Sequence, residues 1–332
     1  MIRIENLVKR YGQKYALDSI SLNISKGEVV GFLGPNGAGK STAMNIITGY
    51  LSATSGNVYI GGIDILSDPS TVKTMIGYLP EQPPLYVDMT VREYLNFVFD
   101  LKKCTYSRKK HIDEICSVVK IADVQNRVIK NLSKGYKQRV GIAQALVGNP
   151  PIIIFDEPTV GLDPKEIIEI RSLIRKLGEK HTVILSSHIL SEVQVICDRI
   201  VIIDSGRIIA DKPTEELARV AETNKKYTLK VCGPLREVLS MLKGLTGIKS
   251  AESTGENDSG TYTFIIEADA NTDIRKALFS ALAEHAWPMM GLEEMSASLE
   301  DIFISIVDSK FESEKETEGV RAAWDDSEND GN

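Results

Sequence analysis

The sequence predicts an α/β protein whose first part is a parallel sheet covered by helices and whose second part is a small α+β domain. Two observations predict the first part. A glycine-rich segment stands between the apolar run Val29–Leu33 and a helical pattern, and strand and helix patterns alternate over residues 152–203, as in parallel sheets with helices on their faces. Around residues 213–226 the chain becomes polar before a new pattern begins, which indicates a domain boundary near residue 220.

The first part begins with strands and changes to helices at about residue 90. The expected strands are residues 2–8, 16–24, 29–33, 58–60 and 76–80. From Val91 to Leu101, apolar residues recur three and four positions apart, which indicates a helix with one buried face. Further helices are expected after Ser107 and after Ser133. We therefore expect residues 1–220 to form one domain with a helical subdomain at about residues 86–147.

The second part is expected to follow the order β-α-β-β-α-β over residues 226–308. The expected strands are 227–232, 251–253, 261–267 and 289–295, and the expected helices are 235–245, 274–285 and 299–307. This order resembles the split β-α-β arrangement of ferredoxin-like domains. Residues 309–332 are rich in Glu, Asp, Ser and Gly, which predicts a solvated, disordered tail.

Composition narrows the class of protein. The chain has 332 residues, of which 42% are hydrophobic and 26% charged, as in soluble globular proteins. It has no apolar run of about 18 residues and no signal-peptide core, and its four cysteines are scattered, so we expect a cytosolic protein without disulfides or a zinc site. Nine acidic and three basic residues after Val307 carry most of the net charge of −7. The rest is nearly neutral, so we expect no nucleic-acid partner.

The glycine-rich segment has the pattern G-x-x-x-x-G-K-S-T of a P-loop. Its residues are Gly34, Pro35, Asn36, Gly37, Ala38, Gly39, Lys40, Ser41 and Thr42. Glycines let successive backbone N–H groups face a phosphate, the lysine reaches the β- and γ-phosphates, and the serine hydroxyl binds Mg²⁺. A buried strand before the loop and a helix over residues 41–48 complete the required context. This segment therefore predicts that the protein binds ATP or a related nucleotide together with Mg²⁺.

A second buried strand ends in two adjacent acids. Residues 152–155 are apolar and are followed by Asp156 and Glu157. Taken alone, acids at a strand end are more often simple surface residues. Beside a P-loop, Asp156 is placed to hold Mg²⁺ near Ser41, and Glu157 is the candidate general base for the attacking water.

A third motif opens a helix with Ser133 and Gly135. In isolation Ser133 would be read as an ordinary N-cap, although a helix N-terminus also suits a phosphate. The order of the three motifs is more informative than any one of them. A P-loop, then Leu-Ser-x-Gly at a helix start, then an apolar strand ending in Asp-Glu resembles the arrangement of ABC-type ATPases, over residues 1–216.

This resemblance implies roles for further residues. Tyr11 resembles the aromatic residue that stacks on adenine, and His188 resembles the switch histidine that contacts the γ-phosphate. In the family, Ser133 and Gly135 would contact ATP held by the other subunit, and Asp163 would lie in the loop that crosses to that subunit. The resemblance therefore implies a dimer in the ATP state, either of two identical chains or with a related ATPase.

Two departures from the family pattern identify a subgroup. Lys134 and Tyr136 replace a glycine and a glutamine, and Glu81 stands where the Q-loop normally has glutamine, with Gln82 next to it. Either residue can then be the one that senses Mg²⁺ and the γ-phosphate. These departures and the segment 298–303 resemble the ATPase subunits of type-2 ABC exporters, which include drug-resistance, polysaccharide and gliding-motility ATPases.

The expected function is ATP hydrolysis that powers transport, in the subgroup export, through a separate membrane permease. The chain would then be cytoplasmic and peripheral at the inner face of the cell membrane, with the permease bound near residues 85–130. The alternative is a soluble, non-transport ABC ATPase acting on ribosomes or DNA. Such proteins carry two cassettes or a long coiled coil, whereas 93 residues separate Lys40 from Ser133 and contain no heptad run.

Overall fold

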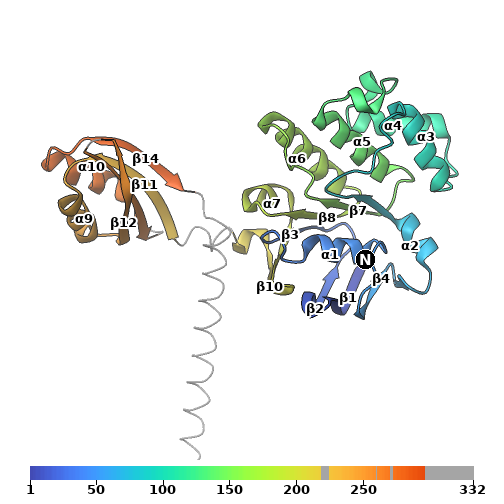
Figure 1. The fold of residues 1–332 in the computed structure, drawn as a ribbon, viewed down its shortest axis with the longest axis horizontal. Coiled ribbons are helices and arrows are strands. Elements are labelled where there is room, and N and C mark those ends of the chain that lie inside the picture. The colour runs from blue at the N-terminus through green and yellow to red at the C-terminus, as the bar shows by residue number, and fades with distance from the viewer. Residues whose placement is uncertain (218–223, 259, 270–271, 296–332) are drawn as a thin grey trace, which may run out of the picture. The chain divides into compact units, whose positions relative to one another are not determined.

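The computed structural model describes residues 1–217, 224–258, 260–269 and 272–295. The chain divides into two units, Met1–Thr214 and Glu215–Asn332 (Figure 1). The first unit holds two sheets and their covering helices, and the described residues from 224 to 295 form one sheet with two helices. The expected helix over residues 299–307 and the expected tail over 309–332 lie outside the described residues.

The N-terminal sheet of the first unit has the strand order β2-β1-β4-β5 and is antiparallel. Its strands are β1 (Ile2–Tyr11), β2 (Lys14–Ile24), β4 (Ser55–Ile60) and β5 (Ile63–Asp64). The strands expected over 2–8, 16–24 and 58–60 are confirmed but are longer than expected. The extra length of β1 and β2 is a polar hairpin, in which Tyr11 pairs with Lys14 around Gly12 at φ 58°, and apolar periodicity cannot reveal such a segment.

The central sheet of the first unit has the strand order β10-β9-β3-β8-β7-β6. Its strands are β3 (Val29–Leu33), β6 (Ile76–Leu79), β7 (Ile152–Asp156), β8 (Thr182–Ser187), β9 (Arg199–Asp204) and β10 (Arg207–Pro213). All neighbours are parallel except β9 and β10. Every residue of β3, β7 and β8 is buried, because helices and the N-terminal sheet cover this sheet, and this explains why their sequences are apolar without alternation.

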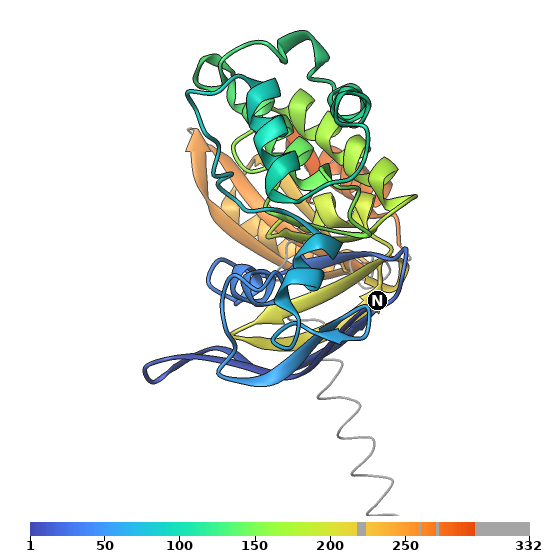
Figure 2. The ribbon, with the colours of Figure 1, turned by 90° about the vertical axis from the view of Figure 1, so that its right-hand side faces the viewer.

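Helices surround the central sheet on both sides. They are α1 (Lys40–Ile47), α2 (Pro69–Met75), α3 (Val91–Leu101), α4 (Arg108–Val118), α5 (Lys134–Leu146), α6 (Pro164–Gly178) and α7 (Leu190–Ile196). Figures 1 and 2 show α3, α4 and α5 grouped on the side of the central sheet away from β1 and β2. Short 3-10 turns at Ala122–Val124 and Ile129–Asn131 connect α4 to α5. The helices expected from Val91, after Ser107 and after Ser133 are therefore present.

Helix α2 was not expected, because it is short and has a single buried residue, Val72. Its signal lies in its first turn rather than in its periodicity. Asp68 caps the helix by accepting a hydrogen bond from the Thr71 N–H at 3.1 Å, and Pro69 occupies the first helical position, as is common at helix starts.

The second unit contains β11 (Asn224–Cys232), α9 (Leu235–Gly244), β12 (Ile248–Asp258), β13 (Thr261–Asp269), α10 (Ile274–Glu284) and β14 (Met289–Met295). Its sheet is antiparallel, with the strand order β12-β13-β11-β14. The expected strands and the first two expected helices are therefore present. Leu229 and Phe264 from the sheet pack with Val238 from α9 and Leu278 from α10 in one buried core. In the part of the chain that the structure describes, no helix has the length and hydropathy needed to cross a membrane.

Candidate functional site

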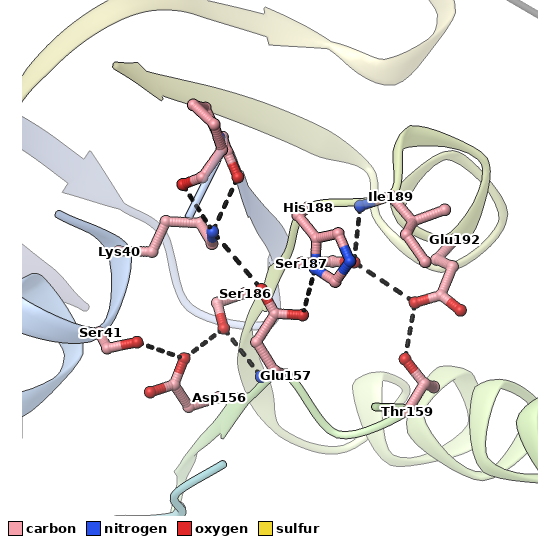
Figure 3. Close-up of polar contacts among 12 residues, drawn as sticks. Lys40, Ser41, Asp156, Glu157, Thr159, Ser186, Ser187, His188, Ile189 and Glu192 are labelled. Atoms are coloured by element: carbon pink, nitrogen blue, oxygen red, sulfur yellow. Dashed lines mark hydrogen bonds and ion pairs between the residues drawn. The ribbon is translucent and has the colours of Figure 1, made fainter. Parts of the chain in front are cut away.

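The site forms at the edge of the central sheet where four parallel strands end. Leu33 at the end of β3 is in register with Ser187 of β8, and Asp156 of β7 is in register with Ser186 of β8. The next strand, β6, ends beside β7. Because parallel strands end at one edge, the segments that follow them come together there. The fold therefore brings the P-loop, the acidic pair and His188 to one place, as Figure 3 shows.

The P-loop connects the end of β3 to the start of α1. The residue that precedes α1 is Gly39 at φ 112°, and no side chain caps this helix. A Cβ at Gly39 would lie 2.5 Å from the Ala16 carbonyl oxygen, so only glycine fits. The first N–H groups of a helix have no partners within it and attract anions. The loop therefore fits the phosphates of a nucleotide.

Lys40 places its charge at the start of α1. Its side chain is only 6% exposed, and Nζ donates to the carbonyl oxygens of Gly34 at 2.7 Å and Pro35 at 3.2 Å. The same ammonium lies 3.4 Å from Glu157 Oε1 (Figure 3). A buried cation between a helix N-terminus and a carboxylate can attract and hold a polyphosphate.

Asp156 lies beside the P-loop serine. It is 3% exposed, and its Oδ1 accepts hydrogen bonds from Ser41 Oγ at 3.2 Å and from Ser186 Oγ at 2.5 Å. A carboxylate and a hydroxyl side by side are oxygen donors of the kind that Mg²⁺ prefers, and such sites usually use few protein ligands. The donor set therefore fits Mg²⁺ bound together with a phosphate.

Glu157 has a backbone and a side chain that are both unusual. Its φ is 48°, in the left-handed region that residues other than glycine rarely adopt, and its N–H donates to Ser186 Oγ at 2.9 Å. Its Oε2 lies 3.0 Å from His188 Nδ1. Its Oε1 is buried and has no hydrogen-bond partner among the described residues, although Lys40 lies nearby. An acceptor held in this way can take a proton from a water molecule.

The two Q-loop candidates follow β6 and line a cavity of about 870 Å³. Glu81 and Gln82 are both exposed and share this cavity with Ser41 and Asp156, so the structure does not choose between them. The cavity wall also contains Tyr78, whose hydroxyl donates to Asn45 Oδ1 at 3.1 Å. Burial, followed by the charge of Asp156, raises the pKa of Tyr78 well above its usual value, so this phenol remains a neutral hydrogen-bond donor.

The other candidate residues lie outside this cluster. Tyr11 is the last residue of β1 and is 54% exposed. Ser133 Oγ accepts from the N–H of Tyr136 at 3.3 Å, and Asp163 Oδ1 accepts from the N–H of Glu166 at 2.8 Å, so each caps its own helix. Gly135 is buried in the first turn of α5, and a Cβ added there would lie 1.8 Å from Glu166 Oε1.

Sequence reasoning missed Ser186 as a site residue. Its hydroxyl touches both Asp156 Oδ1 and the N–H of Glu157, so it fixes the two acids relative to β8. The available signal was a hydroxyl residue within the apolar stretch that leads to His188. Hydroxyl residues are rarely buried without a hydrogen-bond partner, and the two acids at the end of the neighbouring strand β7 would have supplied that partner.

This fold and site define a P-loop ATPase, and comparisons with known proteins narrow the class. The chain matches the ABC transporter family over residues 17–160. It is 33% identical over 312 residues to the linearmycin resistance ATP-binding protein LnrL of Bacillus subtilis (strain 168), over 92% of this chain and 98% of LnrL. It is 40% identical over 213 residues to the lantibiotic transport ATP-binding protein SrtF of Streptococcus pyogenes, over 64% of this chain and 90% of SrtF.

Solved structures agree with these relatives. The dimeric, post-hydrolysis ATP-binding cassette MJ0796 bound to ADP and Pi superposes with a TM-score of 0.60 and 32% identity, over 64% of this chain and 99% of that one. The protein described here belongs to the ABC transporter family and is an ATP-binding, ATP-hydrolysing subunit of the type-2 exporter group. The fold expected for its first part, the ABC cassette, is thereby confirmed.

Proposed function

We propose that Glu157 is the general base of ATP hydrolysis in this subunit. The observation that supports this role is the placement of its buried carboxylate between Lys40 Nζ at 3.4 Å and His188 Nδ1 at 3.0 Å. Glu157 takes a proton as a water oxygen bonds to the γ-phosphorus, and the bond from that phosphorus to the β-phosphate oxygen breaks. Lys40 holds the β- and γ-phosphates, and His188 orients the base and contacts the γ-phosphate.

We propose that the remaining candidate residues bind the nucleotide and Mg²⁺. Ser41 and Asp156 would hold the metal ion, and Glu81 or Gln82 would complete its surroundings from the Q-loop side of the cavity. Bound Mg²⁺ would neutralise charge on the phosphate oxygens. The backbone N–H groups of residues 34–42 would bind the phosphates, and the exposed ring of Tyr11 would stack on adenine.

We propose that two ATP molecules are bound between two subunits. Ser133 and Gly135 of one chain would face the ATP on Lys40 of the other, and Asp163 would lie at the same interface. The support is that Ser133 is exposed at a helix N-terminus and that its hydroxyl contacts its own helix rather than the P-loop. A similar solved cassette is also dimeric.

We propose that hydrolysis powers export through a separate permease, which would hold this subunit at the cytoplasmic face of the membrane. Relatives named for linearmycin resistance and lantibiotic transport support this reading over a soluble, non-transport ABC ATPase. An apolar groove of about 520 Å³ between the Q-loop and α3 supports a docking site. Tyr86 and Phe97 form its wall, with ring centroids 5.2 Å apart, and Leu101 is 64% exposed there.

We also propose the division of the chain into a cassette at residues 1–220, an accessory domain at 226–308 and an acidic tail at 309–332. The accessory domain would be ferredoxin-like. Its strand order, β12-β13-β11-β14, and its antiparallel pairing support this assignment, since each helix connects two strands that are separated by a third.

The test of the base is Glu157→Gln in the full chain. The amide keeps the shape of the side chain but cannot take the proton, so turnover should fall on the order of 10²- to 10⁴-fold while ATP still binds. Phosphate release and binding of a fluorescent ATP analogue measure the two effects. Unchanged turnover in this variant would remove Glu157 from the role of base.

The test of the transport reading is purification of the tagged chain from membranes in mild detergent, followed by mass spectrometry. A multi-spanning protein in stoichiometric amount is expected, and Leu101→Glu should release it while leaving the ATPase activity of the chain unchanged. Ribosomal or DNA-associated partners would instead support the soluble alternative.

A further inference from the structure

A second buried polar network lies directly behind the Glu157–His188 contact. At its centre is Glu192 of α7, which is 3% exposed. Its Oε2 accepts hydrogen bonds from Thr159 Oγ1 at 2.6 Å and from Ser187 Oγ at 3.3 Å (Figure 3). Its Oε1 accepts a hydrogen bond from Arg171 Nη2 of α6 at 2.8 Å. A carboxylate this deeply buried needs such partners. The network therefore has a fixed geometry.

Thr159 connects this network to the strained turn that carries Glu157. The left-handed backbone of Glu157 persists only if its surroundings hold it in place. Hydrogen bonds with β8, α5 and α7 hold residues 157–159 in place. Ser186 of β8 accepts from the N–H of Glu157 at 2.9 Å, Gln138 of α5 donates to the carbonyl of Pro158 at 2.8 Å, and Glu192 holds Thr159.

The same carboxylate also holds the segment that carries His188. Ser187, which precedes the histidine, contacts Glu192 Oε2 through its hydroxyl and accepts from the N–H of Ile189 at 3.0 Å. The Glu192 side chain therefore connects Thr159, two positions after Glu157, to Ser187, which directly precedes His188. Figure 3 shows Glu192 between Thr159 and Ser187, on the side of His188 away from Lys40.

We propose that Glu192 is a positioning residue for ATP hydrolysis, which holds the Glu157 carboxylate and the His188 imidazole at hydrogen-bond distance. This proposal rests on the roles proposed above for Glu157 and His188. Glu192 itself touches neither of them and takes no proton. Arg171 fixes Glu192 in turn, because their ion pair is largely buried, with side-chain exposures of 23% and 4%.

The sharpest test breaks the link at Thr159 and leaves the ion pair intact. Thr159→Val removes only the hydroxyl and keeps the shape of the side chain, whereas Thr159→Ser keeps the hydroxyl and serves as the matched control. A small displacement of a catalytic group costs a large factor in rate. In Thr159→Val we expect kcat to fall on the order of 10-fold or more, with the dissociation constant for an ATP analogue changed by less than about twofold. Thr159→Ser should retain the wild-type kcat.

A double variant tests whether the effect passes through the catalytic pair. Residues that act as one unit show non-additive effects. In a His188→Ala background, Thr159→Val should therefore cause little further loss of kcat. A loss that multiplies with that of His188→Ala would contradict the proposal, as would a normal kcat in Thr159→Val.

Glu192→Gln, compared with Glu28→Gln, separates positioning from general stability. Glu28 forms an ion pair with Arg199 at 3.0 Å, with side-chain exposures of 18% and 24%, so its carboxylate is less deeply buried than that of Glu192. It directly precedes β3, at the end opposite the P-loop. Both variants should lower the melting temperature, but only Glu192→Gln should lower kcat. Equal kcat losses in the two variants would overturn the proposal. Glu157→Gln measured in parallel reports separately on the proposed base.

Discussion

The sheet edge at Lys40 and the start of helix α5 both present groups suited to phosphate, yet their surroundings differ. At the sheet edge, Lys40, Asp156 and Glu157 are each at most 7% exposed and contact one another or shared neighbours. At the start of α5, Ser133 is exposed and its hydroxyl accepts a hydrogen bond from the first turn of its own helix. We propose that the first region is a nearly complete reaction site and that the second is a binding surface for a nucleotide held by another chain.

The two regions therefore suit different roles in the proposed reaction. Buried charges at the sheet edge have partners within the chain, so the chemistry can be built by folding alone. At the start of α5, by contrast, the Glu166 carboxylate packs against Gly135. An anion that binds there would have to compete with this carboxylate for the helix N-terminus. The proposed division of the site between two chains would account for both arrangements.

The largest effect is expected at the sheet edge. Lys40→Ala removes the buried ammonium that faces the phosphates, and loss of one such electrostatic contact commonly costs about 10²- to 10³-fold in turnover. Phosphate release by the full chain measures this effect, with Lys109→Ala, an exposed lysine of α4, as the control. Retained turnover in Lys40→Ala would show that the sheet edge is not the reaction site.

A smaller effect is expected at the far end of α5, where Lys102 Nζ donates to the carbonyl oxygens of Val147 at 2.8 Å and Ala145 at 3.4 Å. Burial lowers the pKa of Lys102 from 10.5 to about 8. Below pH 8 both the folded and unfolded chains are protonated there, and the cost of burying the charge is fully present. Between pH 8 and 10.5 the unfolded chain binds the extra proton, so the free energy of unfolding rises with pH.

The measurement is denaturant unfolding of the wild type and of Lys102→Met across this pH range. The wild type should gain stability relative to the variant, by at most about 3 kcal/mol between pH 7.5 and 10.5. Taking the difference between the two proteins cancels the other groups that titrate there. A constant difference would mean that Lys102 titrates normally.

The smallest effect is expected at the N-terminal end of α5. Ser133→Ala removes the N-cap hydrogen bond to Tyr136, which should lower the free energy of unfolding by about 1 kcal/mol. Ser133→Thr keeps a capping hydroxyl and should recover most of this loss. Because Ser133 is proposed to contact ATP, Ser133→Ala should lower turnover by more than this small loss of stability explains. A loss of turnover no larger than the loss of stability explains would make Ser133 only a helix cap.

Much of the fold could be predicted because its strands are apolar and its turns carry strong signals. The buried run Val29–Leu33 and the strand Met289–Met295 have the bounds expected from the sequence. The hairpin tip of β1 and β2 and the short helix α2 could not be predicted from periodicity, since they bury few side chains. The P-loop and the Asp-Glu pair were visible because their residues are adjacent in the sequence.

Contacts between distant segments could not be predicted in the same way. Glu192 stands in a short helix where a charged residue would ordinarily face solvent, and only the packing of α6 and α7 against the Glu157 turn buries it. The hydroxyl of Ser186 is likewise informative only once β7 and β8 are known to be neighbours. Such residues depend on strand order, which a single sequence does not specify.

The most direct test of the divided site is a mixing experiment with two inactive variants. Lys40→Ala damages one half of the site and Gly135→Asp the other, with melting curves to confirm that both chains fold. Mixing equal amounts should recover up to about a quarter of the wild-type turnover, because half of randomly formed dimers pair the two variants and each such dimer holds one intact site of two. A mixture no more active than its components, or a fully active Gly135→Asp chain alone, would contradict the account.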